Sequence, residues 1–559
     1  MKSSSAQSSY FLAFAHETRP FLSYYQIGAN GWVKTCMTRG QFWDLALQAA
    51  ATLSAYGLGK GDCHLHCFAA NQVADLAFRL GACLVGSVPV TVNWEADTAE
   101  RVCYKLELTD SRLLIHDNMS PLLAEVAHRF PHIPHFDATH LANGETRFDA
   151  AQAVHLDAND ARLVIFTSGT TGKPKGVRHN YLSYETNQAT FEDFLKPGAD
   201  FQLVVANALH HANATAICDW AMRNPGAELH LVSRYASVYW KILSEVAQQG
   251  RGCLIAPVVA RHFDFLASLE ASKKLPVELE ELRHALSGVT FLIGSAPVGP
   301  TTVARILHFT GRLPTVRFGS TETCLQVMGI PYELSEEARQ TAFEKGWDHA
   351  NGPAYYIGRP HPPYTEVRVV QGIDPNRPGF LETCLEGQPG YLITRGKNLM
   401  HAYVKDPDAS CRVLQHGWYT GLLDIGFSLK NELDGQLDFY WKSRESTLLI
   451  RGGANYAYDQ ITDELTDWLI KQAGLAQGSF DLAVVGLRLD SEHEDACCVT
   501  LQLHDQPEQE AIGELLLKGE GITKGARPNY VRYGQIPRNF KGAVVVPELK
   551  QAFRAWLLD

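Results

Sequence analysis

The sequence predicts an α/β protein with a large N-terminal domain and a smaller C-terminal domain, and three observations lead to this prediction. The chain has 559 residues, which is more than one hydrophobic core usually organises. Up to about residue 352, short apolar runs typical of buried strands alternate with segments of helical periodicity, which indicates largely parallel sheets. Beyond that residue, short alternating segments between Gly, Pro and Asp turns favour an antiparallel barrel or sheet.

The N-terminal elements are predicted from apolar spacing. Residues 38–58 carry apolar side chains at helical intervals until Gly57-Leu58-Gly59 ends the pattern, and residues 73–84 form a second predicted helix. Apolar runs predict buried strands at residues 64–68, 88–92, 112–115, 162–166, 202–205, 229–232, 253–255 and 289–293.

The C-terminal elements are shorter. Alternating patterns predict strands at residues 366–370, 390–394 and 436–441. From about residue 446 helix and strand patterns mix again, at residues 460–472, 482–486, 497–503, 508–517 and around Val531. This last stretch is therefore expected to form a separate small α/β domain.

Composition excludes several classes of function. The formal net charge of −11 and the pI near 6.1 argue against a general affinity for nucleic acid or anionic membranes. The N-terminus lacks an apolar stretch long enough for a signal peptide, and no segment predicts a transmembrane helix. The twelve cysteines show neither a disulfide framework nor metal-binding spacing. We therefore expect a cytoplasmic enzyme without nucleic-acid partners or membrane insertion.

A glycine-rich loop is predicted directly after the strand at 162–166. Residues 164–177 read VIFTSGTTGKPKGV, which combines glycines that let backbone N–H groups approach an anion with hydroxyl donors and two lysines. Pro174 after Lys173 distinguishes the loop from a Walker loop. A surface turn made soluble by lysines is the alternative, but the unbroken run of hydroxyls and glycines disfavours it. We expect the loop to hold a polyphosphate.

The segment TSGTTGKPKG, residues 167–176, resembles the phosphate-binding signature of the adenylate-forming superfamily, and the chain as a whole resembles its stand-alone acyl-CoA synthetases. The resemblance implies a large domain over residues 1–442, built from two stacked αβα subdomains plus a small β-barrel at about 352–442. It also implies a hinge at 443–446 and a small mobile α+β domain at 447–559. The phosphate-binding residues that it implies are Thr167, Ser168, Gly169, Thr170, Thr171, Gly172, Lys173 and Lys175.

A second segment, RFGSTET at residues 317–323, resembles the superfamily's aromatic-Gly-x-Thr-Glu motif. The resemblance implies that the aromatic residue flanks adenine, that the threonine binds the α-phosphate and that the glutamate holds Mg²⁺. A carboxylate beside a polyphosphate is repulsive unless a cation bridges the two, so the residue types agree with a metal. The residues implied by this segment and by a preceding small-residue turn are Gly294, Ser295, Ala296, Phe318, Gly319, Ser320, Thr321 and Glu322.

Segments further along the chain extend the resemblance. Asp424 is expected to bind the ribose hydroxyls, although Leu-Leu separates it from the usual Thr-Gly. Arg444 is the expected second ribose or phosphate contact, and Ser446 stands where the family's hinge residue is usually Asp or Lys. Gly452 and Gly453 resemble the glycines that let the backbone pass close to the pantetheine thiol of CoA.

The pocket for the acid is expected near His210, His211 and Thr323. A structural role for the histidines is as well supported as pocket lining, because a lone histidine is more often a hydrogen-bonded structural residue. Cys324, Leu325, Val327 and Met328 are small or apolar, and no guanidinium is taken to lie near them in sequence. This pattern favours an apolar or aromatic acid over a dicarboxylate.

The resemblance implies two half-reactions. A carboxylate first attacks the α-phosphate of Mg·ATP to give an acyl-adenylate and pyrophosphate. A thiol, most often that of CoA, then takes the acyl group and AMP is released. Two alternatives remain open: transfer of the activated group to an amine, a nitrogen species or a carrier thiol, and a catalytically weakened relative that binds nucleotide.

The segment IPRNFKGAVVVPELK, residues 536–550, corresponds to the loop that carries the superfamily's catalytic lysine. An alignment without gaps places Ala543 at the position of that lysine, and Lys541 lies two residues earlier. Four readings are open: Lys541 replaces the usual lysine, adenylation proceeds weakly without it, the protein binds nucleotide without catalysis, or Ala543 is an engineered replacement.

Overall fold

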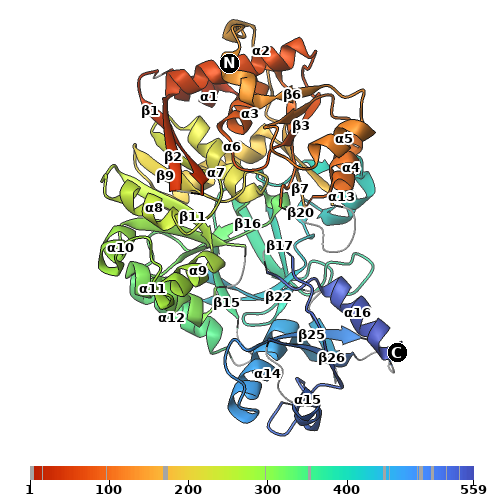
Figure 1. The fold of residues 1–559 in the computed structure, drawn as a ribbon. Helices are drawn as coiled ribbons and strands as arrows, with labels where there is room; N and C mark the ends of the chain where they lie inside the picture. The colour runs from red at the N-terminus through yellow and green to blue at the C-terminus, as the bar shows by residue number, and fades with distance from the viewer. Residues whose placement is uncertain are drawn as a thin grey trace.

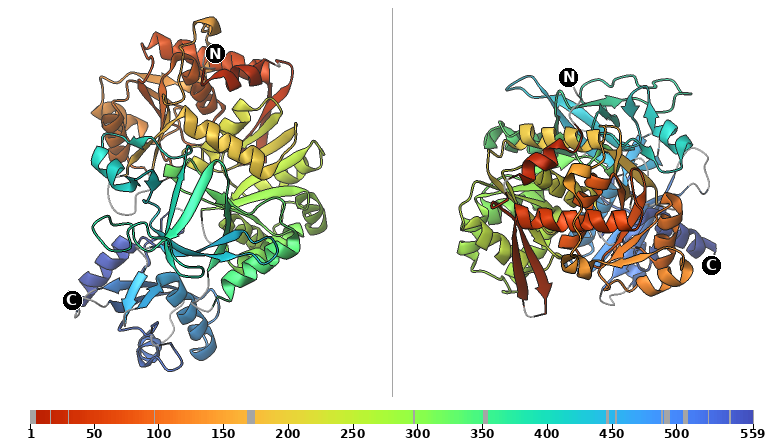
Figure 2. Two further views of the ribbon diagram at one scale, coloured as in Figure 1. Left: turned by 180° about the vertical axis from the view of Figure 1, so that it is seen from behind. Right: turned by 90° about the horizontal axis from the view of Figure 1, so that it is seen from above.

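A computed structural model of the protein describes residues 5–15, 17–29, 31–95, 97–167, 174–295, 298–349, 354–444, 448–451, 454–487, 489, 495–504, 509–523, 525–539 and 542–558. Within these ranges, no helix has both the length and the apolar content that crossing a membrane requires. Figures 1 and 2 show a large N-terminal domain with a smaller C-terminal domain at one end of it.

A seven-stranded sheet carries the glycine-rich loop. Its strand order is β18-β8-β7-β4-β3-β5-β6; the strands from β7 to β6 are parallel, while β8 and β18 pair antiparallel. The strands are β3 (Cys63–Cys67), β4 (Val88–Thr91), β5 (Leu114–His116), β6 (His135–Asp137), β7 (Ala161–Phe166), β8 (Gly176–Asn180) and β18 (Ala402–Tyr403). Between them in the chain lie α3 (Val73–Val85), α4 (Ala99–Thr109), α5 (Leu123–Arg129), and the 3₁₀ turns Ala138–Asn143 and Ala150–Gln152.

The second sheet is parallel at one end and antiparallel at the other. Strands β13, β12, β11, β9, β10 and β1 are parallel neighbours in this order, and β2 pairs antiparallel with β1 at the edge. The parallel strands and β2 are β1 (Pro20–Gly28), β2 (Gly31–Thr38), β9 (Phe201–Val205), β10 (Ala227–Val232), β11 (Cys253–Val259), β12 (Val289–Gly294) and β13 (Thr315–Phe318).

Beyond β13 every pairing in this sheet is antiparallel, which gives the barrel-like part of the large domain. Its strands are β14 (Met328–Gly329), β15 (Tyr355–Pro360), β16 (Thr365–Val370), β17 (Gly390–Gly396), β19 (Leu414–Gln415), β20 (Trp418–Tyr419), β21 (Asp424–Lys430) and β22 (Leu437–Arg444). The change from parallel to antiparallel pairing falls at β13, next to the predicted nucleotide motif.

Two hydrophobic cores cover the two faces of the larger sheet. The first joins both sheets and contains side chains of α2, α3, α6 and α7 together with Ile165 of β7 and Leu203 of β9. The second contains side chains of α8 to α12 with Val204 of β9. The helices are α1 (Ser8–Phe14), α2 (Arg39–Ala55), α6 (Tyr181–Leu195), α7 (Ala212–Arg223), α8 (Tyr239–Ala247), α9 (Ala260–Ala271), α10 (Leu279–Leu286), α11 (Pro300–Thr310), α12 (Glu336–Trp347) and α13 (Pro407–Val413). This layering agrees with two stacked αβα units.

The C-terminal domain has a core of its own, whose buried residues all come from Leu449 onwards. It contains β23 (Leu448–Arg451), β24 (Ala454–Ala457), β25 (Phe480–Leu487), β26 (Ala496–Leu503), β27 (Tyr530–Tyr533), α14 (Tyr458–Gln472), α15 (Gln509–Lys518) and α16 (Val546–Leu558). The hinge at residues 443–446 stays a prediction.

Most elements lie where the apolar patterns predict them. The helix predicted at residues 38–58 is α2, and Thr38 caps it, because its side chain accepts from the Gln41 N–H while the Gln41 side chain accepts from the Thr38 N–H. Each of the eight strands predicted in the N-terminal part is present, several with shifted ends. The β1–β2 hairpin and the β13–β14 pair were not predicted.

Asp219 of α7 is the centre of a buried ion cluster. Its carboxylate accepts hydrogen bonds from Arg162 of β7 at 2.8 Å, from Arg223 at 2.7 Å and from the Tyr10 hydroxyl of α1 at 2.7 Å. Burial alone would raise the pKa of Asp219, but Arg223 and Arg162 together hold that pKa below its usual value. The cluster therefore ties α1, α7 and β7 together through a charged carboxylate.

Asp219→Ala is expected to lower the free energy of unfolding of the large domain by about 3–5 kcal/mol, because it leaves two buried guanidinium groups without their carboxylate. Asp200→Ala is the matched control: the ion pair of Asp200 with Arg19 is largely exposed, and its loss should cost less than about 1 kcal/mol. Urea titration of both variants measures the difference, and equal losses would contradict the role of the cluster.

Candidate active site

The glycine-rich loop leaves and re-enters the sheet at one point. β7 and β8 form an antiparallel pair in which Phe166 faces Gly176. Just beyond this pair, the Thr167 N–H donates to the Lys175 carbonyl at 3.0 Å, and the Lys175 N–H donates to Thr167 Oγ1 at 3.2 Å. These bonds close the neck of the loop. The remaining predicted phosphate ligands, Ser168, Gly169, Thr170, Thr171, Gly172 and Lys173, lie outside the described residues.

The turn after β13 is tightly fixed by its own backbone. The Ser320 N–H donates to Thr323 Oγ1 at 2.8 Å, and the Thr323 hydroxyl donates to the Ser320 carbonyl at 3.1 Å. A Cβ atom on Gly319 would lie 2.0 Å from the Leu325 carbonyl oxygen, so only glycine fits there. Thr321 and Glu322 are thereby held in a 3₁₀ turn, Thr321–Thr323, at the carboxyl end of a parallel strand, where ligands of α/β sheets commonly bind.

Glu322 and Lys175 meet at a tyrosine that the sequence motifs do not mark. The Tyr403 hydroxyl of β18 donates to Glu322 Oε1 at 3.0 Å, and Lys175 Nζ lies 4.7 Å from the centroid of the Tyr403 ring. Burial and the Glu322 carboxylate both raise the pKa of Tyr403, so its hydroxyl stays a donor at neutral pH. The Glu322 backbone carbonyl accepts from the Met400 N–H at 2.7 Å. The structure therefore brings together two predicted site residues from separate motifs.

His179 of β8 supports the same turn from the glycine-rich loop side. Its Nε2 lies 2.8 Å from the Thr321 carbonyl oxygen. Burial lowers the pKa of His179 to about 4, so the ring is neutral at pH 7 and donates its Nε2–H to that carbonyl. This hydrogen bond links the strand that follows the loop to the Thr321–Thr323 turn.

Asp424 opens β21 with a buried side chain. Its Oδ1 accepts from the Trp441 indole N–H at 2.9 Å, and in the β21–β22 pair Asp424 faces Arg444. The two leucines between Thr-Gly and Asp424 are accommodated locally: Leu422 is buried in the barrel core, and Leu423 adopts a φ of 56°. The side chain of Arg444 lies outside the described part of the chain, and so does Ser446.

The small-residue turn and the histidine segment follow strands of the larger sheet. Gly294 ends β12, and Ser295 follows it with a φ of 72°, a left-handed backbone conformation that is uncommon for non-glycine residues. His210 is buried against Trp94, with ring centroids 4.4 Å apart, and its ring also contacts that of His211, which directly precedes α7. Ala296 is outside the described residues.

Within residues 536–550, Arg538 and Val544 pair antiparallel as the stem of a short hairpin, and the chain enters α16 at Val546. The Asn539 N–H donates to the Ala543 carbonyl at 2.9 Å, and the Gly542 N–H donates to the Asn539 carbonyl at 2.8 Å. Gly542 has a φ of 79°, and a Cβ atom there would lie 2.0 Å from Nη1 of Arg261 in α9. Lys541, like Gly452 and Gly453 between β23 and β24, lies outside the described residues.

Gly542→Ala is expected to lower the adenylation rate by up to about tenfold, because the added Cβ strains a residue with a φ of 79° and pushes aside the Arg261 guanidinium that contacts the hairpin. Gly478→Ala is the matched control, since Gly478 has a φ of 88° in the same domain but nothing within 4 Å of an added Cβ. Acid-dependent pyrophosphate release measures both variants. Equal losses would show that backbone strain alone, and not the contact with Arg261, is responsible.

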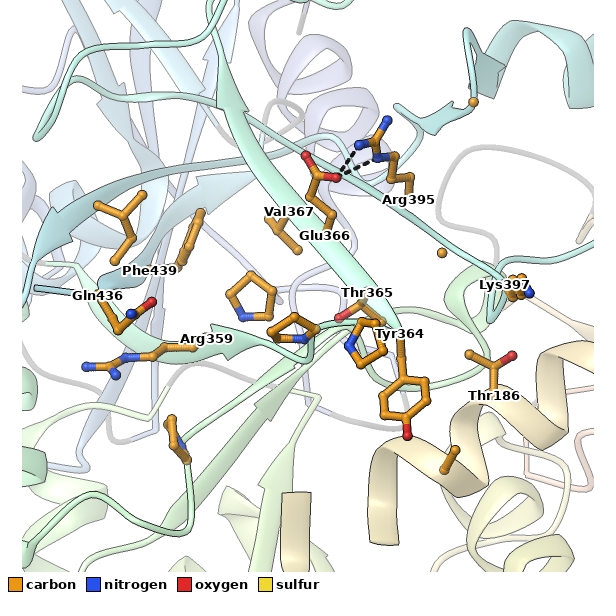
Figure 3. A pocket seen from close by; sticks show the side chains of 18 of the residues that line it. Thr186, Arg359, Tyr364, Thr365, Glu366, Val367, Arg395, Lys397, Gln436 and Phe439 are labelled. Carbon is orange, nitrogen blue, oxygen red and sulfur yellow. Dashed lines mark hydrogen bonds and ion pairs between the residues drawn. The ribbon is translucent and has the colours of Figure 1, made fainter. Parts of the chain in front are cut away.

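A separate groove of about 1160 Å³ lies between α6 and the barrel-like strands (Figure 3). Glu366 of β16 and Arg395 of β17 form an ion pair at its edge, and Tyr364 and Phe439 also line it. None of the predicted site residues that the structure describes lines this groove. It is therefore distinct from the site formed by the glycine-rich loop and the Thr321–Thr323 turn.

Comparison with known proteins adds relatives of similar length. The family model described as AMP-binding enzyme matches residues 18–404. The long-chain-fatty-acid–CoA ligase FadD13 of Mycobacterium tuberculosis is 25% identical over 530 residues, which cover 93% of each chain. The crotonobetaine/carnitine–CoA ligase of Proteus mirabilis is 25% identical over 529 residues, covering 90% of this chain and 91% of that one. The ATP-bound crystal structure of MatB from Rhodopseudomonas palustris has a TM-score of 0.76 at 19% identity, covering 98% of this chain and 99% of that one.

These findings agree with the geometry of the site. The match to the family model spans more than half of the chain and includes the glycine-rich loop, the Thr321–Thr323 turn and Tyr403. The likeness to MatB extends the agreement in fold to the C-terminal domain. The chain thus belongs to the AMP-binding enzyme family of the adenylate-forming superfamily.

Proposed function

We propose that the protein is an AMP-forming acid–thiol ligase. It activates a carboxylic acid with ATP as an acyl-adenylate, releases pyrophosphate and transfers the acyl group to a thiol, that of CoA. The observation that supports this best is the meeting of two motifs at Tyr403: Lys175 at the neck of the glycine-rich loop and Glu322 in the turn after β13. An ammonium group and a carboxylate arranged in this way suit a phosphate that is bound together with a cation.

The first half-reaction requires two anions to approach each other. The acid's carboxylate attacks the α-phosphorus of ATP, the bond to the bridging oxygen breaks, and pyrophosphate leaves with that oxygen. Little covalent chemistry is left for the protein, so catalysis is mainly positioning and neutralisation of charge. We assign the phosphates to the loop at residues 167–175 and the α-phosphate to Thr321, whose backbone is fixed by His179.

The residues present fit a magnesium ion that is held largely by the substrate. Among the described residues no group of three or more metal-ligating side chains occurs. Mg²⁺ in nucleotide sites is usually bound by one or two carboxylates together with phosphate oxygens and water, and Glu322 supplies such a carboxylate, oriented by Tyr403. When bound, the ion would neutralise charge on the phosphates.

Transfer to CoA is assigned to the C-terminal domain. Gly452 and Gly453 are the proposed passage for the pantetheine arm, and residues 443–446 are the proposed hinge about which the domain reorients between the half-reactions. The relatives named above act on a long-chain fatty acid and on crotonobetaine or carnitine, which differ in charge and size. Neither acid is carried over to this chain.

The proposal is tested by incubating the protein with ATP, Mg²⁺, CoA and a panel of carboxylic acids. Acid-dependent pyrophosphate release together with a CoA thioester is the expected result. Pyrophosphate release without a thioester would instead support transfer to another nucleophile. Nucleotide binding with no pyrophosphate release for any acid would overturn the proposed function.

A further inference from the structure

Arg317 of β13 is buried, and two of its three guanidinium nitrogens have no partner among the described residues. Its side chain is 4% exposed, and its Nε and Nη2 atoms are buried with no hydrogen-bond partner in the described part of the chain. No carboxylate among the described residues lies within ion-pair distance of it, in contrast to the buried Arg79, Arg162 and Arg223. The buried Arg39 also lacks a carboxylate, but its Nη2 donates to the backbone carbonyls of Asn224 and Ala227. Burial lowers the pKa of Arg317 to about 10, so the group is still charged at pH 7.

An isolated buried guanidinium is unfavourable for folding. Charges in protein interiors are normally paired, because removing a charge from water costs several kcal/mol unless a partner compensates. A ligand that supplies the missing anion would compensate this cost, and ionisable groups with strongly perturbed surroundings cluster at functional sites. Arg317 is therefore a candidate contact for a ligand that the protein binds.

Glycines on both neighbouring strands leave room for this side chain. Val316 pairs with Ile293 of β12, so that Arg317 stands beside Gly294, and Arg317 pairs with Gly329 of β14. Directly opposed residues of neighbouring strands point to the same face. A Cβ atom added to Gly294 would lie 3.3 Å from Cγ of Arg317, so the side chain lies over the backbone of Gly294.

The guanidinium faces the layer of α6 and α7. Val316 and Ile293 belong to the core on the α8–α12 side, so their neighbours Arg317 and Gly294 point to the opposite face. Leu292, on the face of Gly294, belongs to the core that α6 and α7 share. Phe194 of α6 lies against Gly329 on this face.

This position lies between two segments of the proposed site. Arg317 directly precedes Phe318 and the Thr321–Thr323 turn on β13, while Gly294 begins the turn assigned to adenine. In the layer that Arg317 faces, α7 begins just after His210 and carries Asn213 in its first turn. The Oδ1 atom of Asn213 is also buried without a hydrogen-bond partner in the described residues. The acid of an acyl-adenylate bound at Thr321 would extend from the phosphate into this region.

We propose that Arg317 binds a second carboxylate on the acid, so that the substrate is a dicarboxylic acid; this inference rests on the proposed function. A guanidinium matches a carboxylate in geometry, with two parallel N–H donors, and Nε and Nη2 are the pair that would form such a fork. This preference for a diacid reverses the expectation of an apolar or aromatic acid, which rested on the absence of a guanidinium near Thr323 in sequence. The guanidinium lies on the strand before that turn.

The test compares monocarboxylic and dicarboxylic acids of equal carbon number, from three to eight carbons, by pyrophosphate release and thioester formation. We expect the wild-type protein to use one dicarboxylic acid with a kcat/KM at least about 100 times that of its monocarboxylic partner. Arg317→Met should lower kcat/KM for this diacid by about 100-fold or more and leave or improve the rate for the monoacid. Arg312→Met, an exposed arginine on the same segment, should change neither.

A second measurement is independent of turnover. The preferred diacid, added with AMP, should raise the Tm of the wild-type protein and of Arg312→Met but not that of Arg317→Met. Arg317→Met should itself fold, because it replaces an unpaired buried charge by an apolar side chain of similar length. Thioester formation with monoacids only, or equal losses for both acids in Arg317→Met, would overturn the role of Arg317 while leaving the proposed function intact. No pyrophosphate release with any acid would overturn the proposed function itself.

Discussion

Replacing Glu322 with alanine is expected to lower the rate of acid-dependent pyrophosphate release by about 10²- to 10³-fold. In the proposed function this carboxylate holds the cation that neutralises the phosphates, so its loss leaves the reacting phosphate poorly compensated. The turn should survive, because the Glu322 backbone carbonyl is bonded to Met400 and the Ser320 backbone is bonded to Thr323. The effect should therefore appear in the rate and not in Tm.

Two further variants separate the charge of Glu322 from its orientation. Glu322→Gln keeps the size and removes the charge, and we expect it to lose about as much activity as Glu322→Ala. Tyr403→Phe removes only the hydroxyl that orients the carboxylate, which should cost up to about tenfold and raise the Mg²⁺ concentration needed for half-maximal rate. Glu337→Ala, exposed on α12, is the control. Full activity of Glu322→Gln at low Mg²⁺ would refute the assignment.

The parts of the site that are contiguous in sequence were predictable, and the contacts between them were not. The glycine-rich loop and the turn around Glu322 are short motifs, and their residue types alone indicate binding of phosphate and of a cation. Tyr403 lies on β18, far from both in sequence, and it meets them only because β18 pairs with β8. Nothing in the local pattern around Tyr403 marks it. Arg317 was visible in the sequence, but its lack of a partner depends on the packing of α6 and α7.

The fold shows the same limit. The strands β4 and β12 are buried on both faces and are largely apolar, so they can be predicted from short apolar runs. The buried strands β3 and β9 are also found in this way, although β3 contains His64 and His66 and β9 contains Gln202. The hairpin of β1 and β2 was missed because its partner β10 lies about 200 residues away and its second strand is largely exposed. An edge strand of this kind has no apolar alternation to detect. Its pairing is decided by tertiary packing.

The second large effect concerns the hairpin that stands at the place of the superfamily's catalytic lysine. Lys541→Ala is expected to lower acid-dependent pyrophosphate release by about 10²- to 10³-fold. The substitution removes an ammonium group that would neutralise the acid's carboxylate and the α-phosphate as they approach each other. The stem of the hairpin is fixed by Asn539, and Gly542 lies against Arg261 of the large domain. Lys541 is the direct neighbour of this contact in the chain. Lys518→Ala, at the end of α15 in the same domain, is the control for a general loss of positive charge.

Ala543→Lys then decides whether Lys541 replaces the usual lysine or whether Ala543 stands where a lysine belongs. The N–H and carbonyl of Ala543 are both hydrogen-bonded to Asn539. A lysine side chain at residue 543 would therefore extend from a fixed backbone position in the stem of the hairpin. Lys541 precedes Ala543 by two residues, which corresponds to at most about 7 Å along an extended chain. If Lys541 is the working lysine, Ala543→Lys should change the rate by less than about twofold and should not rescue Lys541→Ala. We expect this result because the contact with Arg261 is made by Gly542, next to Lys541, while the side chain of Ala543 is exposed. A gain of about 100-fold from Ala543→Lys in either background would reverse the assignment, because it would show that the stem position reaches the reacting phosphate.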